Sequence, residues 1–212
     1  NGIRCVAKYL FDNGIAKGQK VGEGRHVLHI DTKSGVKECT VITKNGLVSK
    51  VTVDMGKAEL APEKVPVRLE GEKVVNKPIS IGGNVYRITC CSMGNPHCTV
   101  FVPSVDKLDL EDLGPKFEHD PMFPDRVNVE FVEVIDQHTL KARIWERGSG
   151  ETMACGTGAC ASAVAAILCG RCKEGEDIVV KLRGGDLTIR VEGSRVWMTG
   201  EAVTVFEGTV TV

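Results

Sequence analysis

The chain has 212 residues and 42% hydrophobic content, enough to fill one large core or two small ones. Lys and Arg number 27 against 28 Asp and Glu, and neither sign gathers in a long block. This balance argues against a surface for nucleic acid or anionic membrane. No apolar run reaches the roughly 18 residues of a membrane span, so we expect a soluble protein.

The nine cysteines are odd in number, and several lie in apolar stretches where a free thiol packs as a small hydrophobe. We therefore expect a reducing, cytoplasmic setting without a disulfide framework. The chain begins at Asn1-Gly2 and runs directly into an apolar periodic stretch. We expect it to be a fragment that starts inside a motif.

The first part of the chain predicts one helix followed by sheet. Apolar residues recur at spacings of three and four from Gly2 to Phe11, which is typical of an amphipathic helix with Asn1 as its N-cap. Short β-branched runs follow, and Asn45-Gly46 offers a hairpin turn. The predicted strands are 27–30, 39–43 and 48–53.

The segment from Met55 to Lys64 has little periodicity and contains Gly56 and Pro62, so a domain boundary is expected near it. Beyond it the predicted helices are 110–118 and 156–169. The predicted strands are 85–91, 99–102, 128–134, 140–145, 178–182, 187–191, 196–199 and 203–206. The second helix is apolar on every face, which predicts burial all round.

Cys155 stands at the start of that buried helix, between glycine-containing segments. Free amides and the partial positive charge of a helix N-terminus bind carboxylates and lower the pKa of a thiol. One element could therefore hold an amino acid's carboxylate and present a base beside its α-carbon. From local sequence alone, a buried structural cysteine is an equally good interpretation.

Four separated motifs occur in order along the chain: Asn1-Gly2-Ile3-Arg4-Cys5, Gly94-Asn95-Pro96-His97, Arg126-Val127-Asn128, and Glu146-Arg147-Gly148 followed by Cys155-Gly156-Thr157-Gly158. With these motifs, and with Trp197 to Ala202 near its end, the chain resembles the diaminopimelate epimerases from end to end. The resemblance implies an α+β fold of two pseudo-symmetric domains, each a curved, mostly antiparallel sheet or barrel around a central helix. The first domain, expected over 1–53 plus 203–212, would be incomplete, and the second would cover 54–202.

The resemblance also implies the chemistry, which is a stereoinversion at the α-carbon of diaminopimelate by two thiols on opposite faces, without a cofactor. Cys155 would be one catalytic thiol, and the second would precede Asn1. The resemblance implies that the reacting carboxylate is bound by Asn1, Gly2, Gly156 and Thr157. It implies that the rest of the substrate is bound by Asn95, Asn128, Glu146 and Arg147, with the Arg147 guanidinium forming two hydrogen bonds to the distal carboxylate. It also implies that His97 and Glu146 adjust the pKa values of the thiols.

The resemblance further implies a homodimer, although Phe206 replaces the tyrosine that many family members place in the dimer contact. Without the second thiol, we expect this chain alone to bind substrate at best. No metal is expected, because His26, His29, His119 and His138 share no ligand spacing with the cysteines.

Other interpretations stay open at this point. Gly156 to Ala161 fits a dinucleotide fingerprint with Asp177 as the ribose ligand, but a seven-residue polar loop precedes the helix. A proline or hydroxyproline racemase would share the paired cysteines, and a binding module without catalysis would follow from the missing thiol. Cys169 and Cys172 have the spacing of a redox pair, yet they come after a helix rather than before one.

Overall fold

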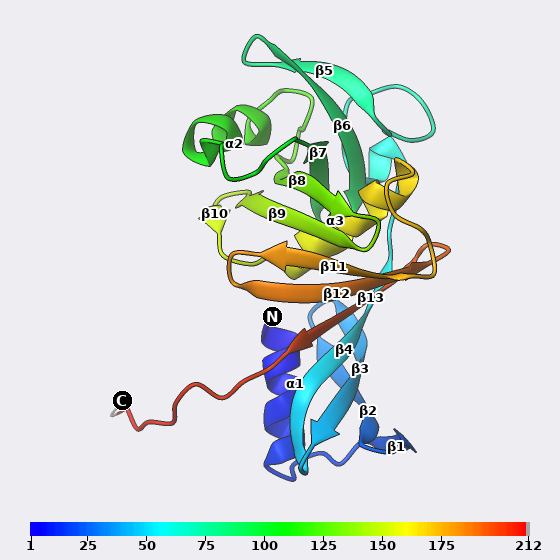
Figure 1. Cartoon of the computed structure of the whole chain (residues 1–212), viewed down its shortest axis with the longest axis vertical. Coiled ribbons are helices and arrows are strands. Elements are labelled where there is room, and N and C mark those ends of the chain that lie inside the picture. Colours follow the sequence, from blue (N-terminus) through cyan, green and yellow to red (C-terminus); the bar gives the residue numbers. More distant parts are fainter. Residues whose placement is uncertain (211–212) are drawn as a thin grey trace. The chain divides into compact units, whose positions relative to one another are not determined.

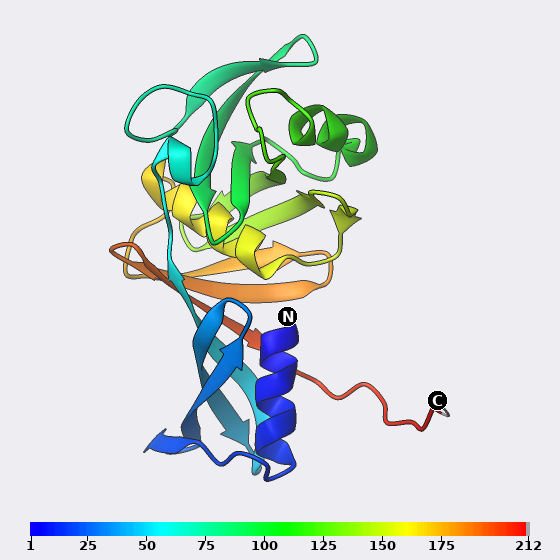
Figure 2. The same cartoon turned by 180° about the vertical axis from the view of Figure 1, so that it is seen from behind.

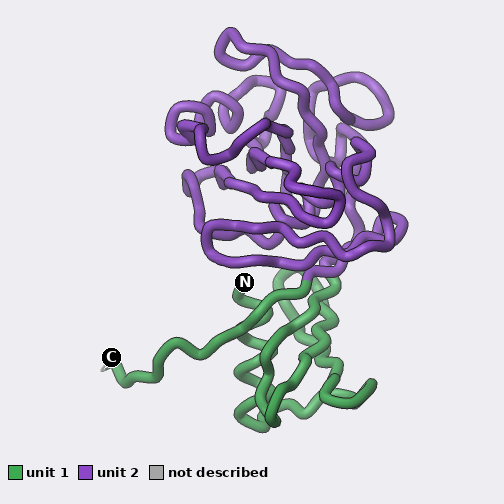
Figure 3. The backbone as a smooth tube through the Cα atoms, viewed as in Figure 1, with its two compact units in different colours: residues 1–54, 199–212 green, residues 55–198 purple. Residues whose placement is uncertain are grey.

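The computed structural model describes residues 1–210 and divides into two compact units (Figure 3). Unit 1 comprises residues 1–54 together with the chain from 199 onward, and unit 2 comprises residues 55–198. The chain crosses between the units twice, after Asp54 and after Met198. The helices within residues 1–210 are too short or too polar to span a lipid bilayer.

Unit 1 is a helix on an antiparallel sheet. Its elements are α1 (Gly2–Asp12), β1 (Gln19–Gly22), β2 (Arg25–Thr32), β3 (Gly35–Lys44) and β4 (Leu47–Lys57), whose last residues enter unit 2. Each strand pairs with the next, and α1 packs against β3. Asp12 fixes the end of the helix to β4, because its carboxylate accepts the Val48 amide at 2.8 Å and the Lys8 ammonium at 2.6 Å.

The turn between β3 and β4 forms as the sequence predicts. Asn45 and Gly46 both adopt positive φ angles, 54° and 81°. Such angles match the right-handed twist of the flanking strands, and Asn-Gly adopts them at little cost.

The predicted strand at Val203–Phe206 is wrong. Residues 202–210 form no helix or strand, and the side chains of Val203, Val205 and Phe206 are 70%, 87% and 84% exposed. The alternation of apolar and polar residues is typical of a strand, but a strand also needs a neighbouring backbone for its hydrogen bonds. None of the described strands pairs with this segment, and residues 211–212 lie outside the described chain.

Unit 2 is a strongly curved sheet around the helix α3 (Gly156–Leu168), seen from both sides in Figures 1 and 2. The strand order is β13-β12-β11-β9-β8-β7-β6-β5, with β10 added to β9. The β7–β8 and β9–β11 pairs are parallel. The strands are β5 (Lys77–Ile81), β6 (Asn84–Ser92), β7 (Pro96–Phe101), β8 (Asn128–Asp136), β9 (Thr139–Glu146), β10 (Gly150–Thr152), β11 (Asp177–Leu182), β12 (Gly185–Glu192) and β13 (Arg195–Glu201).

Small side chains allow α3 to lie inside the sheet. Every residue from 158 to 166 is buried, as the all-apolar pattern predicts, and the helix packs on six strands of the unit.

The strand prediction missed β1, β5 and β10. β5 contains Pro78, which cannot donate a ladder hydrogen bond and is tolerated here because β5 is an edge strand.

β7 and β8 are covered on both faces, which decides where their polar residues lie. One face carries Cys98, Val100, Val129 and Phe131 into an apolar cluster under α2 (Leu110–Glu118), where the Phe117 and Phe131 rings meet edge to face at 5.6 Å. Because successive side chains alternate between faces, His97, Asn128 and Glu130 point to the other face, toward the start of α3.

Candidate active site

Cys155 is the N-cap residue of α3. Its backbone is extended, with φ −129° and ψ 115°, and its Sγ accepts the amide of Gly158 at 3.4 Å. The Thr157 Oγ1 lies 3.5 Å from the same sulfur. Cys155 is buried, but two polar groups of the helix start are directed at its sulfur, unlike a cysteine that merely fills apolar space.

The pKa of the Cys155 thiol is raised to about 11, mainly by burial. The hydrogen bond from Thr157 opposes this effect, the charges of Glu130 and Glu146 add to it, and the Gly158 amide opposes it. The donors at the helix start lower this pKa, as predicted, but burial outweighs them and the net shift is upward. The thiolate loses more hydration on burial than the two donors restore.

Gly158 allows the close approach at this point. A Cβ at residue 158 would lie 2.7 Å from Ile144 Cδ1 and 3.0 Å from Glu130 Oε1. Gly156 is less confined, since a Cβ there would meet only the flexible end of Met198, with Sδ at 3.0 Å. The glycine at 158 thus brings the helix start against β8 and β9.

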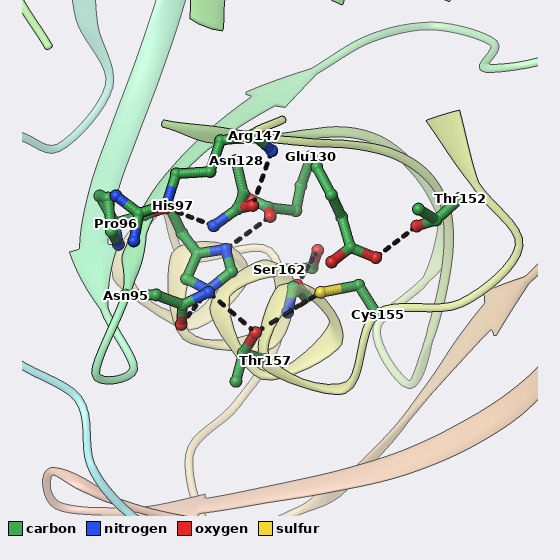
Figure 4. A network of polar contacts seen from close by, with 12 residues as sticks. Asn95, Pro96, His97, Asn128, Glu130, Arg147, Thr152, Cys155, Thr157 and Ser162 are labelled. Carbon is green, nitrogen blue, oxygen red and sulfur yellow. Dashed lines mark hydrogen bonds and ion pairs between the residues drawn. The ribbon is translucent and has the colours of Figure 1, made fainter. Parts of the chain in front are cut away.

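A chain of polar contacts joins β7 and β8 to Cys155 (Figure 4). His97 Nδ1 lies 2.7 Å from Glu130 Oε1, and its Nε2 lies 3.0 Å from Asn95 Oδ1. The Asn95 amide nitrogen donates to Thr157 Oγ1 at 3.4 Å, and that hydroxyl reaches the Cys155 sulfur. Three of the predicted site residues, Asn95, His97 and Thr157, therefore form one continuous path with the thiol.

Asn128 holds the segment that carries Arg147. Its amide nitrogen donates to the Pro96 carbonyl at 2.9 Å, and its Oδ1 accepts the Arg147 backbone amide at 3.0 Å. The Arg147 guanidinium donates to the Asp125 carbonyl at 2.8 Å. The structure thus places Asn128 and Arg147 together, with one N–H and the oxygen of the Asn128 amide bonded to backbone groups.

Glu146, the last residue of β9, accepts the Thr152 hydroxyl through Oε1 at 2.5 Å. Its charge raises the pKa of both Cys155 and Glu130. The predicted role in tuning the thiol stays a prediction, and the geometry gives it a physical route.

Asn1 and Gly2 belong to unit 1 and are exposed at the start of α1. Asn1 is the N-cap residue, as predicted, and its Oδ1 accepts from the Arg4 guanidinium at 3.1 Å. Their expected contact with the reacting carboxylate stays a prediction.

The sequence analysis missed Glu130. It is fully buried, contacts His97, and lies two residues beyond Asn128 on the same face of β8. A charged residue inside the apolar run Val129 to Val132 is the signal that could have identified it, since buried carboxylates need a partner.

Two other features lie apart from this site. Hollows of about 340 and 330 Å³ in unit 2 are lined by other residues, including Lys141 and Lys181 in the first and Ile167 and Val191 in the second. At the end of α3, Cys169 and Cys172 are both free thiols, and burial raises the pKa of Cys172 to about 11. A thiol with so high a pKa is a poor redox nucleophile.

Among residues 1–210, no group of three His, Cys, Asp or Glu side chains is arranged to hold a metal ion.

The helix start also lacks the geometry of a dinucleotide site. In that fold, a buried parallel strand turns directly into the helix. Here β10, a three-residue strand antiparallel to β9, precedes residues 153–155 and the helix.

Comparisons with known proteins agree with this geometry. The family model described as diaminopimelate epimerase matches residues 89–205. The chain is 48% identical to the diaminopimelate epimerase of Acetivibrio thermocellus over 99% of its own length and 72% of that protein. It is 49% identical to the diaminopimelate epimerase of Geobacillus kaustophilus over 98% of its own length and 70% of that protein.

Solved structures show the same fold at much lower identity. A probable proline racemase from Agrobacterium radiobacter K84 aligns with a TM-score of 0.70 at 16% identity, over 98% of this chain and 66% of that one. A hydroxyproline epimerase from Agrobacterium vitis aligns with a TM-score of 0.66 at 18% identity, over 93% of this chain and 61% of that one. The predicted α+β class with a curved sheet around a central helix is confirmed. On the sequence matches, the chain belongs to the diaminopimelate epimerase family.

Proposed function

We propose that Cys155 is an acid/base group with which this isomerase interconverts LL- and meso-diaminopimelate by moving the proton on the α-carbon. One observation supports it above all. A cysteine caps a buried helix, and an amide and a hydroxyl of the first turn are directed at its sulfur. Donors in these positions stabilise the sulfur when it carries negative charge.

The raised pKa keeps the Cys155 thiol protonated at neutral pH, which suits the step that delivers a proton to the α-carbon. In the opposite direction Cys155 removes the α-proton as a thiolate, and the Gly158 amide and the Thr157 hydroxyl stabilise that form. Epimerisation exchanges protons on opposite faces of the α-carbon, so Cys155 serves one face and the second thiol, expected before Asn1, serves the other.

The start of α3 also provides for the reacting carboxylate. The first amides of a helix have no partner within it, so those of Gly156 and Thr157 can donate to a carboxylate beside Cys155. Asn1 and Gly2 would complete this binding. A carboxylate held there places the α-carbon next to the sulfur.

Arg147, with Asn95 and Asn128, would hold the distal amino-acid end that distinguishes diaminopimelate from proline. The planar guanidinium can form two parallel hydrogen bonds to a carboxylate, whereas lysine cannot. We expect Arg147→Lys to raise the KM for LL-diaminopimelate about 10- to 100-fold with a smaller change in kcat. Steady-state kinetics of the full-length protein would test this.

Arg190→Lys is the matched control for Arg147→Lys, since Arg190 lies on β12 and forms exposed ion pairs with Glu192 and Asp177. Its KM should stay at the wild-type value. An unchanged KM in Arg147→Lys would remove Arg147 from the proposed site.

A proline or hydroxyproline racemase is the rival activity, since structures of both kinds share the fold. The sequence matches and the position of Arg147 favour a substrate with a second charged end. Incubation with proline and with LL-diaminopimelate in heavy water separates the two activities. Deuterium should enter the α-position of diaminopimelate alone.

We also propose a cytoplasmic homodimer that needs no cofactor. All nine cysteines are free thiols in the structure, which supports a reducing compartment. The exposed Val203, Val205 and Phe206 offer apolar surface that a second copy could cover. Sedimentation equilibrium of the full-length protein tests the dimer, and a monomer at micromolar concentration would contradict it.

A further inference from the structure

Glu130 is a buried carboxylic acid for which neither sequence nor family resemblance gave a role. Its side chain is fully buried on β8, and Oε1 contacts His97 Nδ1 at 2.7 Å. Oε2 is buried and, within residues 1–210, has no hydrogen-bond partner. A buried acid lowers stability unless its interactions offset the lost hydration, and the ion-pair partner of Glu130 among residues 1–210 is His97, which is charged only when protonated.

The contacts of His97 determine where the protons lie. Asn95 Oδ1 can only accept, so the His97 Nε2 that faces it at 3.0 Å must carry hydrogen and donate. One further proton then lies in the link between His97 Nδ1 and Glu130 Oε1. It makes either an imidazolium beside a carboxylate or a neutral imidazole beside a carboxylic acid.

The hydrogen bonds that follow, from Asn95 to Thr157 and from Thr157 to Cys155, all donate toward the Cys155 sulfur. Asn95 accepts from His97 through Oδ1, so its amide nitrogen is turned toward Thr157 Oγ1, to which it donates. Since Thr157 Oγ1 accepts this bond, its own hydrogen is available for the Cys155 sulfur. On the opposite side, Glu130 Oε1 lies against Gly158, whose amide also donates to that sulfur.

We propose that Glu130 is a positioning residue of the epimerase reaction: its link to His97 directs the hydrogen bonds through Asn95 and Thr157 so that they end as a donor on Cys155. The inference rests on the proposed role of Cys155 as acid/base group. Glu130 itself touches neither the sulfur nor, on this proposal, the substrate.

Loss of the link proton would reverse the whole chain. His97 would then carry its hydrogen on Nδ1 and donate to the Glu130 carboxylate, which leaves an acceptor at Nε2. Asn95 would turn its amide nitrogen toward His97, and the Thr157 hydroxyl would donate to Asn95 Oδ1 instead of to Cys155. The sulfur would lose one of its two donors.

The reversal is expected in the neutral pH range. Burial raises the pKa of Glu130 to about 7, opposed by His97 and reinforced by Glu146. The link therefore holds its proton below about pH 7 and loses it as the pH rises above that value. Cys155, Cys91 and Cys98 are the other ionisable groups whose titration involves Glu130, and burial keeps all three thiols protonated at this pH.

Nitrogen NMR of the wild-type, full-length protein labelled with 15N-histidine tests the reversal directly. The His97 signals are identified by their absence from the spectrum of His97→Asn. We expect Nε2 to be protonated at pH 6 and Nδ1 alone at pH 8. A single tautomer over this whole range would overturn the proposal.

Kinetics of Glu130→Gln provide a second test, because glutamine keeps the shape and a hydrogen bond but cannot titrate. The ratio of kcat at pH 8 to kcat at pH 6 should be about tenfold smaller in the wild type than in Glu130→Gln. The KM values of the two proteins should agree within about twofold. Glu133→Gln is the control on the same strand and should keep the wild-type ratio, since Glu133 bonds the Val105 amide instead. An unchanged ratio in Glu130→Gln would contradict the proposal.

The two proposals can fail separately. Full activity in Cys155→Ala would refute the proposed function while leaving the NMR result on His97 intact. A fixed His97 tautomer would refute the role of Glu130 while leaving Cys155 in place. Should Glu130→Gln fail to fold, the wild-type NMR experiment still decides.

Discussion

Replacing Cys155 by alanine is expected to lower the rate of LL- to meso-diaminopimelate conversion about 10²- to 10⁴-fold in the full-length protein, with little change in KM. A positioned acid or base contributes an effect of this size to a proton transfer. Alanine removes the sulfur but leaves the amides of the first turn, which bind the carboxylate. Chiral chromatography of the two isomers over time measures the rate.

Cys172→Ala is the matched control for Cys155→Ala. Both thiols are buried, and burial raises the pKa of each to about 11, but Cys172 follows the end of α3, and the charges that act on it are those of Asp136 and Glu176. Its rate should remain within about twofold of wild type, because general loss of a buried sulfur affects stability rather than chemistry. Equal losses in both variants would mean that Cys155 is a structural cysteine.

Replacing Gly114 by alanine is expected to destabilise unit 2 by about 3 kcal/mol, at the upper end of overpacking effects. A Cβ at residue 114 would lie 2.1 Å from Trp145 Cδ2 and 2.4 Å from its Cγ. The indole cannot move away cheaply, because it is buried and its Nε1 donates to Glu118 at 2.7 Å. The same carboxylate accepts the Gly148 amide, so the clash also disturbs the segment that carries Arg147.

The direction in which Gly114→Ala changes the free energy of unfolding distinguishes the steric clash from the effect of helix propensity. Alanine is better than glycine inside a helix by about 1 kcal/mol, so propensity alone predicts stabilisation. Gly22→Ala serves as the control, since its nearest contact, Arg25 Cβ at 3.9 Å, is an ordinary one. Urea unfolding of both variants gives the answer, and a stabilised Gly114→Ala would contradict the packing of α2 on Trp145.

Much of the fold follows from local pattern. A buried helix was predicted at 156–169 because its residues are apolar on every face, and the structure has it at 156–168 with residues 158–166 buried. The Asn45-Gly46 hairpin was predicted from turn chemistry that needs no tertiary information. β5 and the C-terminal segment were not predicted correctly, because strand formation depends on which backbone lies alongside, and local sequence does not contain that information.

The site divides in the same way. Ordered motifs identified Asn95, His97, Asn128 and Cys155, and the structure brings these four into one connected cluster. The sign of the Cys155 pKa shift could not be predicted, because it depends on how deeply the thiol is buried against its two donors. Glu130 was missed for a related reason. Its contact with His97 depends on the register of β7 and β8, which places the two residues diagonally beside each other.

The origin of the hydrogen on the product's α-carbon tests the role of Cys155 most directly. LL-diaminopimelate is converted in heavy water, and mass spectrometry follows product and remaining substrate through the first turnovers. With one thiol on each face, meso product should carry one deuterium from the start while recovered LL substrate stays unlabelled, and Cys155→Ala should abolish this labelling. Product that retains its original hydrogen, or equal labelling in Cys155→Ala, would contradict the assignment.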